Sequence, residues 1–145
     1  MKTNGGFLVT KIKQLGDRIF ERILAEKNID AFNGAQGRIL YVLWQEDGVP
    51  IKIISEKSGL AITSLTTMLE RMEKNGLISR KTDEADKRKT LLFLTDKAKE
   101  LKEAYDSVSN EMGNIYYRDF TDKEILQFEE YLNRIMVNLE EWSDK

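Results

Sequence analysis

Residues 51–95 read IKIISEKSGLAITSLTTMLERMEKNGLISRKTDEADKRKTLLFLT, and this stretch decides the expected fold. A short apolar helix, with Pro50 in its first turn, precedes a turn at Gly59. A second helix, rich in Ser and Thr, follows the turn and ends at Asn75-Gly76, where a glycine can adopt a left-handed backbone conformation. The segment therefore predicts two helices joined by a tight turn.

Two strand-like runs, residues 78–82 and 89–94, follow the second helix and flank a charged tip. The tip, residues 83–89, reads DEADKRK and holds no apolar residue larger than Ala85, so it should face solvent or phosphate. Helix, turn, helix and hairpin in this order outline a winged helix-turn-helix. That fold places one helix in a DNA major groove and the hairpin beside it.

The Ser/Thr-rich helix has two different faces. An apolar stripe with i, i+3, i+4 and i+7 spacing indicates the core side: Leu65, Met68, Leu69 and Met72. The opposite face carries Thr63, Ser64, Thr66, Thr67, Glu70 and Arg71. Ser and Thr are indifferent helix formers, and capping by Thr63 or Ser64 explains one hydroxyl rather than four. Contact with base edges and phosphates is the functional explanation.

In the tip, Asp86 and Arg88 are separated by one residue and can meet across a turn. A carboxylate at this point would hold the guanidinium extended, and a narrow minor groove attracts an inserted arginine. The alternative is a solvated surface ion pair of negligible energetic value.

Composition limits the chemistry. The 145 residues suffice for one domain and include neither cysteine nor histidine. Thiol chemistry, Ser-His-Asp catalysis and the common Cys or His metal sites are therefore excluded, and no paired-carboxylate or phosphate-cradling motif remains. We expect no enzyme activity, no cofactor and no metal. The sequence has neither a signal-peptide core nor a run of membrane-spanning length, so a cytoplasmic protein is expected.

The overall net charge of −2 hides a local division. Residues 51–95 carry 9 Lys and Arg against 6 Asp and Glu, a net of +3, whereas residues 96–145 carry 7 against 13, a net of −6. A DNA-binding segment on acidic dimerisation helices would show this distribution, because phosphate attraction needs local positive charge. Ordinary scatter is the alternative explanation.

Helices are also expected on both sides of this segment. Periodicity predicts them over about residues 7–26 and 35–45, from Thr95 to about Ile115, and from Thr121 to Trp142. Thr121 and Glu124 form a capping-box pattern at the start of the last one. Its apolar stripe is too long for a terminal helix of a small domain to hide: Ile125, Phe128, Leu132, Ile135, Met136, Leu139 and Trp142. A partner surface explains it, with intramolecular packing as the alternative.

From about Phe7 to Leu139, the order and spacing of these elements resemble the MarR family of winged-helix transcriptional regulators. The motifs that carry the resemblance are LERMEKNGLISR at 69–80, DKR at 86–88 and LT at 94–95. The expected fold class is therefore mainly α with a small β-hairpin wing (α+β), a winged helix-turn-helix with N- and C-terminal dimerisation helices. One MarR-type domain is expected over 1–145, with the winged helix at about 35–95 and dimerisation helices at about 7–26 and 96–142.

The resemblance also implies roles for residues. The DNA-binding set is Thr63, Ser64, Thr66, Thr67, Arg71, Asp86, Lys87 and Arg88, with Arg88 as the wing arginine. The dimerisation set is Leu8, Ile12, Phe128, Leu132, Ile135 and Leu139. Three positions depart from the family pattern: Thr67 replaces a common basic residue, Ala61 a polar helix cap, and Ala98 a frequent glycine. The missing cap at Ala61 favours a helix start at Thr63.

The implied function is a homodimeric, sequence-specific regulator of transcription, more often a repressor, on a pseudopalindromic operator in double-stranded DNA. The family often senses small aromatic ligands, and a cleft here could be lined by Tyr41, Trp44, Tyr105 or Met112, although core packing explains the same residues better. Two alternatives remain: a winged helix used only for protein contacts, and a small carboxylate enzyme, which the missing histidine and cysteine disfavour.

Overall fold

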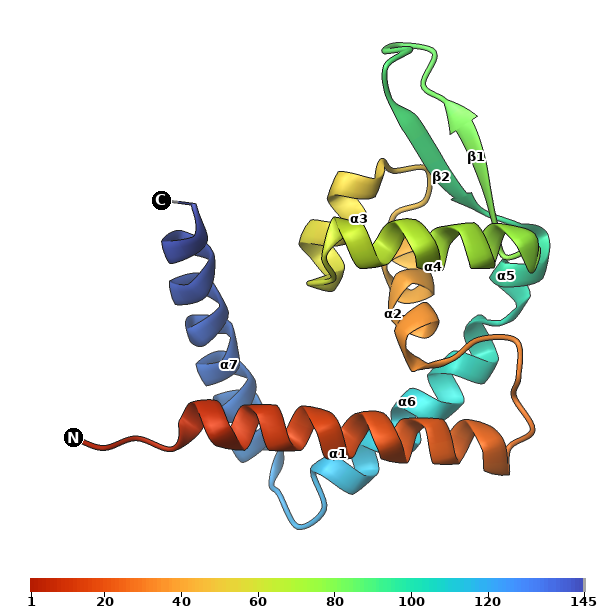
Figure 1. Cartoon of the computed structure of the whole chain (residues 1–145). Helices are drawn as coiled ribbons and strands as arrows, with labels where there is room; N and C mark the ends of the chain where they lie inside the picture. Colours follow the sequence, from red (N-terminus) through yellow and green to blue (C-terminus); the bar gives the residue numbers. More distant parts are fainter. Residues whose placement is uncertain (145) are drawn as a thin grey trace. The chain divides into compact units, whose positions relative to one another are not determined.

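The computed structural model describes residues 1–144, which form helices and one two-stranded antiparallel sheet (Figure 1). The elements are α1 (Gly5–Glu26), α2 (Gly34–Gln45), α3 (Ile51–Ser58), α4 (Ile62–Lys74), β1 (Ile78–Thr82), β2 (Thr90–Leu94), α5 (Asp96–Glu100), α6 (Lys102–Tyr116) and α7 (Asp122–Ser143). Contacts divide the chain into two compact units, residues 1–110 and residues from 111 onward. The predicted class, mainly helical with a hairpin wing, is confirmed.

The core of the first unit lies between α2, α3, α4 and the hairpin. Its largest fully buried side chains are Ile39, Leu40, Leu43, Ile54, Leu65, Leu69, Met72, Leu77, Ile78, Leu92 and Val108. The apolar stripe predicted for α4 faces this core: Leu65, Leu69 and Met72 are buried and Met68 is half-buried. Burying such side chains contributes about 1.5–3 kcal/mol each, so this stripe fixes which face of α4 remains outside.

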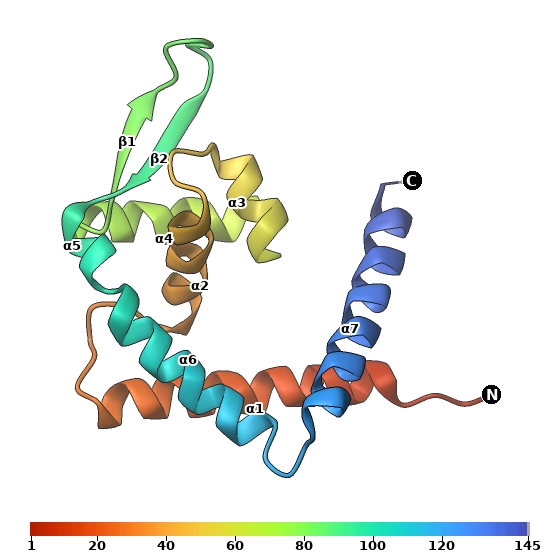
Figure 2. The ribbon, with the colours of Figure 1, turned by 180° about the vertical axis from the view of Figure 1, so that it is seen from behind.

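The hairpin pairs Ile78 with Leu94 at its base and Thr82 with Thr90 toward its tip. The sequence left open which alternate residues of β2 face inward, and the structure answers this: Leu92 and Leu94 are buried. Val49, just before α3, forms a bridge to Leu92 on the edge of β2 opposite β1. In both views the rest of the hairpin extends beyond α2, α3 and α4 (Figure 2).

Three predicted boundaries were wrong. Helix α4 begins at Ile62 rather than at Thr63, and its N-cap Ala61 provides no side-chain hydrogen bond. Strand β2 begins at Thr90 rather than at residue 89, because the Lys89 N–H donates to the Asp86 carbonyl within the turn. The long helix expected from Thr95 to about Ile115 is divided at Leu101, whose N–H bonds back to Ala98 only three residues away.

The second unit contains the end of α6, a turn and α7. The predicted capping box is present: the Glu124 N–H donates to Thr121 Oγ1 (3.2 Å) and the Thr121 N–H to Glu124 Oε1 (2.9 Å). In the turn, the Tyr117 ring lies edge-on to Phe120 and Phe128, and its hydroxyl donates to Glu129 Oε2 over 2.7 Å. Burial first, and this bond second, raise the pKa of Tyr117 to about 12.

Candidate nucleic-acid interface

Helix α4 presents its hydroxyl-rich face to solvent. Every residue predicted for that face is exposed: Thr63, Ser64, Thr66, Thr67, Glu70 and Arg71. The Thr66 hydroxyl donates to the Ile62 carbonyl oxygen four residues earlier over 3.0 Å. Arg71 makes no ion pair within residues 1–144. Since no side chain caps the start of α4, the capping explanation for these hydroxyl residues does not hold.

The tip of the hairpin is shaped by local hydrogen bonds. The Ala85 N–H donates to Asp83 Oδ1 (2.9 Å), and the Asp83 N–H donates to the Lys89 carbonyl (2.9 Å). Asp86 Oδ1 accepts both the backbone N–H and the Nε–H of Arg88, each over 3.1 Å, and Oδ2 lies 3.3 Å from an Arg88 terminal nitrogen. The predicted meeting of Asp86 and Arg88 is present in this geometry.

This pairing holds the arginine without hiding it. The Arg88 side chain is 91% exposed, whereas that of Asp86 is 29% exposed. The side-chain bond from Arg88 lowers the pKa of Asp86 below its ordinary 3.8, so the carboxylate stays ionised at neutral pH. The guanidinium keeps donors that Asp86 does not occupy, and these can bind a phosphate or a base edge. Lys87, beside it, is exposed and makes no ion pair in the described part of the chain.

Hydrogen bonds join the end of α4 to the base of the hairpin. Thr95 donates twice across this junction, through its hydroxyl to the Gly76 carbonyl (2.6 Å) and through its N–H to the Leu77 carbonyl (3.1 Å). Lys97 Nζ reaches the Asn75 carbonyl (3.0 Å), and Arg80 Nε lies 3.5 Å from Glu73 Oε1. The helix face and the wing tip are therefore carried on one connected framework.

Sequence reasoning missed several of these positioning residues. Asp47 accepts the Leu94 N–H over 2.8 Å and so fixes the end of β2 on the side away from β1. Its only sequence signal is an acidic residue before Gly48, a pattern that also marks an ordinary turn. Thr95 was predicted only as the start of a helix. It does cap that helix, since its hydroxyl accepts the Ala98 N–H. Ile62 is also exposed, and no sequence pattern set it apart from the apolar stripe of α4.

The aromatic residues named as candidate cleft lining instead pack on one another. The Tyr105 ring lies 5.2 Å from Trp44, 5.9 Å from Tyr41, and 6.1 Å from both Phe20 and Phe32, measured between ring centroids. Burial raises the pKa of Tyr105 above its ordinary 10.0. The Trp44 indole N–H donates to the Ala98 carbonyl over 3.2 Å. Trp44, Tyr105 and Met112 are half-buried and Tyr41 is 48% exposed, so the three rings pack at the margin of the first unit, and the expected burial in its core is only partial.

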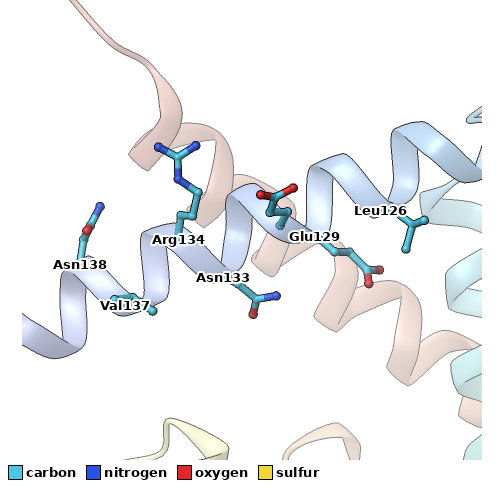
Figure 3. Close-up of a pocket in the computed structure, with 7 residues that line it drawn as sticks. Leu126, Glu129, Asn133, Arg134, Val137 and Asn138 are labelled. Carbon is cyan, nitrogen blue, oxygen red and sulfur yellow. The ribbon is translucent and has the colours of Figure 1, made fainter.

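The predicted dimerisation residues lie on the terminal helices. Leu8 and Ile12 of α1 and Phe128, Ile135 and Leu139 of α7 are exposed, and Leu132 is half-buried. Another side of α7 is largely polar, and Figure 3 shows Glu129, Asn133, Arg134 and Asn138 extending from it. The depression there is lined by α7 alone and offers no enclosed site. Within residues 1–144 no acidic cluster could hold a metal ion, and no helix is long and apolar enough to span a bilayer.

Comparison with known families gives the site its context. Residues 32–90, which contain α2, α3, α4, β1 and the hairpin tip, match the model of the MarR family. This part of the chain is similar to the winged helix of the MarR family. The MarR resemblance predicted from the motifs at 69–80 and 86–88 is thereby confirmed, and the exposed face of α4 and the tip of the hairpin fall inside the matched region.

Two curated proteins similar to this chain are transcriptional regulators. One is the HTH-type transcriptional regulator TtmR of Methylorubrum extorquens, 36% identical over 77 residues, which are 53% of this chain and 40% of that protein. The other is the organic hydroperoxide resistance transcriptional regulator of Bacillus subtilis, 42% identical over 64 residues, which are 44% of each chain. The chain thus spans less than half the length of these two relatives.

Solved structures show the same fold over nearly the whole chain. A MarR transcriptional regulator from Methanosarcina mazei has a TM-score of 0.82 at 21% identity, covering 94% of this chain and 96% of its own. Mutant MarR from Escherichia coli complexed with operator DNA scores 0.80 at 22% identity, covering 90% and 91%. BpsR of Bordetella bronchiseptica, whose DNA binding is regulated by 6-hydroxynicotinic acid, scores 0.81 at 18% identity, covering 92% and 99%.

Proposed function

We propose that this protein is a cytoplasmic, non-catalytic regulator of transcription that binds double-stranded DNA sequence-specifically. The observation that carries the proposal is the Asp86–Arg88 pair, which holds a 91% exposed guanidinium at the hairpin tip of a MarR-family winged helix. An isolated surface pair of this kind contributes little to stability, so its value lies in positioning the arginine for a ligand. Phosphates and base edges are the ligands that a positioned guanidinium fits best.

The helix face supports the same conclusion. Thr63, Ser64, Thr67 and Arg71 are exposed on α4 and offer hydroxyl and guanidinium groups of a length suited to a groove. The net charge of +3 over residues 51–95 supplies local attraction to phosphate despite the overall −2. Operator DNA is what the fold relative from Escherichia coli was crystallised with, and we extend that ligand class to this chain.

The protein acts as a homodimer and, in this proposal, as a repressor that occupies its operator. Apolar side chains exposed on α1 and α7 supply the dimer surface, among them Leu8, Ile12, Phe128 and Leu139. A two-fold dimer places its recognition helices about one DNA turn (~34 Å) apart, so the operator should be a pseudopalindrome with half-sites at that spacing.

In vitro selection from random duplex DNA with the purified full chain tests this proposal. We expect enrichment of a pseudopalindromic site whose affinity falls steeply with added salt, because phosphate contacts release counterions. A matched duplex with scrambled half-sites is the control and should bind weakly. If no sequence were enriched and any association proved insensitive to salt, the winged helix would serve protein contacts instead.

A small aromatic effector that releases the DNA is the second part of the proposal. Its support is the concentration of rings around Tyr105, which offers stacking partners to an aromatic ligand, together with the regulation of BpsR DNA binding by an aromatic acid. Trp44 lies in this cluster, and in a Trp142→Phe variant its fluorescence reports on the cluster without a contribution from the second tryptophan. Titration with 6-hydroxynicotinic acid and simple phenols should change that fluorescence and weaken operator binding in parallel.

A further inference from the structure

Ile62 occupies an unusual position for an apolar side chain. It is the first residue of α4, and 48% of it is exposed although its helix buries Leu65 and Leu69 completely. Single exposed apolar residues are common on protein surfaces and need no explanation by themselves. Ile62, however, begins helix α4, whose outward face otherwise carries only hydroxyl and charged groups. This is the face that we propose to enter the major groove.

Thr66 stands one turn after Ile62, and its hydroxyl is already engaged. Thr66 Oγ1 donates its hydrogen to the Ile62 carbonyl oxygen over 3.0 Å. Since a hydroxyl has a single hydrogen, Thr66 has no donor left for a base edge. Residues four apart lie on the same helix face, so the Thr66 methyl group and the Ile62 side chain together form an apolar pair at the start of α4.

The major groove contains one apolar group that such a pair can distinguish. Thymine carries a methyl group at C5, whereas cytosine and both purines present only polar edges or a hydrogen at the corresponding places. Contact of an apolar side chain with this methyl group removes both surfaces from water and so favours thymine over cytosine. The hydroxyl groups of Ser64 and Thr67 donate and accept indifferently, and they discriminate less between bases.

We propose that Ile62, together with the Thr66 methyl group, is a specificity-determining residue that reads the C5-methyl group of a thymine in each half-site. The inference rests on the proposed DNA-binding function and makes it more specific, because it names the chemical group read by the start of α4. It assigns Thr66 an apolar role in place of the hydrogen-bonding one that its hydroxyl suggests.

Deoxyuridine substitution tests this directly, because uracil differs from thymine only by lacking the C5-methyl group. The site selected by the wild-type chain is synthesised with each thymine replaced in turn, symmetrically in both half-sites, and the affinity is measured for each duplex. At one thymine position we expect a loss of about fourfold per half-site, the equivalent of one buried methyl group. Replacing that base by 5-methylcytosine should retain more affinity than replacing it by cytosine.

Variants of Ile62 and Thr66 then test whether these two side chains contact the thymine C5-methyl group. Ile62→Ala should lose most of the discrimination between the thymine and uracil duplexes, whereas the matched Ile62→Val, which retains two methyl groups, should still distinguish them. Thr66→Ser, which keeps the hydroxyl and loses the methyl group, should reduce the discrimination, and Thr66→Val should preserve it. Circular dichroism of each variant confirms folding.

The possible outcomes distinguish a failure of thymine recognition by Ile62 from a failure of the proposed DNA binding. If the wild-type chain selects a site but no thymine in it responds to uracil, or if Ile62→Ala responds as the wild type does, the inference is overturned and DNA binding stands. If the wild-type chain selects no DNA at all, both the inference and the proposed function are wrong.

Discussion

At the residue scale, the wing tip shows how a short sequence places one side chain. An unrestrained arginine loses rotamer freedom when it binds, at a cost of up to about 2 kcal/mol. Asp86 holds the Arg88 guanidinium through its Nε–H and a terminal N–H, while the side chain remains 91% exposed. The Arg88 side chain is therefore partly ordered before a ligand binds and loses less conformational entropy on binding, which is how preorganisation favours affinity.

The first prediction concerns this pair. Arg88→Ala should weaken operator binding by about 1–3 kcal/mol, because it removes a positioned contact to DNA. Asp86→Ala should cause a smaller loss, since Asp86 only orients the arginine. The measurement is an operator titration at fixed salt, with circular dichroism and sedimentation to show that the helices and the oligomeric state are unchanged.

Arg118→Ala provides the matched control for charge. Arg118 is also largely exposed, lies outside the winged helix, and its removal changes the net charge by the same amount. We expect its operator affinity to stay at the wild-type value. An Arg88→Ala variant that bound the operator as tightly as this control would contradict the role assigned to the wing.

The second prediction separates sequence reading from phosphate contact. Ser64→Ala and Thr66→Ala should reduce discrimination between operator and random DNA, because both side chains are exposed on α4 and neither serves as its cap. Lys87→Ala should lower both affinities together and reduce the salt slope by about one. A competition assay at several salt concentrations measures both quantities. Neutral Ser64→Ala and Thr66→Ala variants would remove these two side chains from base recognition.

At the scale of elements, local patterns predicted the helices and the hairpin, and non-local contacts decided the details. The 3.6-residue spacing of Leu65, Leu69 and Met72 was enough to orient α4. The inward face of β2 was not predictable, because Leu91–Leu94 is continuously apolar and the choice depends on pairing with Val49, far away in the sequence. The start of α4 was misplaced because Ala61 gives no capping signal.

In the candidate site, too, local contacts were predictable from the sequence and non-local contacts were not. The Asp86–Arg88 pair was predictable since both partners lie within three residues, so the turn itself brings them together. The links of Thr95 to Gly76 and of Asp47 to Leu94 join segments that the sequence does not connect. The exposure of Ile62 was not predictable, because the sequence does not distinguish this isoleucine from the buried apolar residues beside it, and only the fold shows that it is exposed.

The third prediction concerns the turn between α6 and α7. Burial and the hydrogen bond to Glu129 raise the pKa of Tyr117 to about 12, so the folded state holds this proton more tightly than the unfolded state, where the pKa is near 10.0. The resulting stabilisation is complete below pH 10 and disappears as the pH rises from about 10 to 12. Glu129→Gln should lower the pKa of Tyr117 toward 10 without restoring it fully, since burial remains.

Spectrophotometric titration of tyrosinate, compared between the wild type and this variant, measures the shift. Glu130→Gln is the matched control, because Glu130 is the next residue on α7 and its carboxylate accepts no hydrogen bond from Tyr117. An unchanged Tyr117 titration in Glu129→Gln would show that the carboxylate does not hold this turn in solution.

At the scale of the whole molecule, the terminal helices carry more apolar surface than the chain covers by itself. No residue of α7 within the described chain is fully buried, and its exposed side chains include Phe128, Ile135 and Leu139. Exposed apolar surface on this scale marks an interface between proteins. A single winged helix also makes too few base contacts to select one site in a genome, so the proposed function requires two copies.

The last prediction therefore concerns the dimer. Leu132→Glu should place an unpaired carboxylate in the middle of the apolar stripe of α7, and burying such a charge without a partner costs several kcal/mol. We expect the variant to sediment as a monomer or to aggregate, and specific operator binding to be lost although Ser64, Thr66 and Arg88 are unchanged. Asn133→Glu adds the same charge at the neighbouring, exposed position of α7 and should remain a dimer. A wild-type chain that sedimented as a monomer and still bound a single half-site tightly would refute the dimeric operator model, since one winged helix would then be sufficient for recognition.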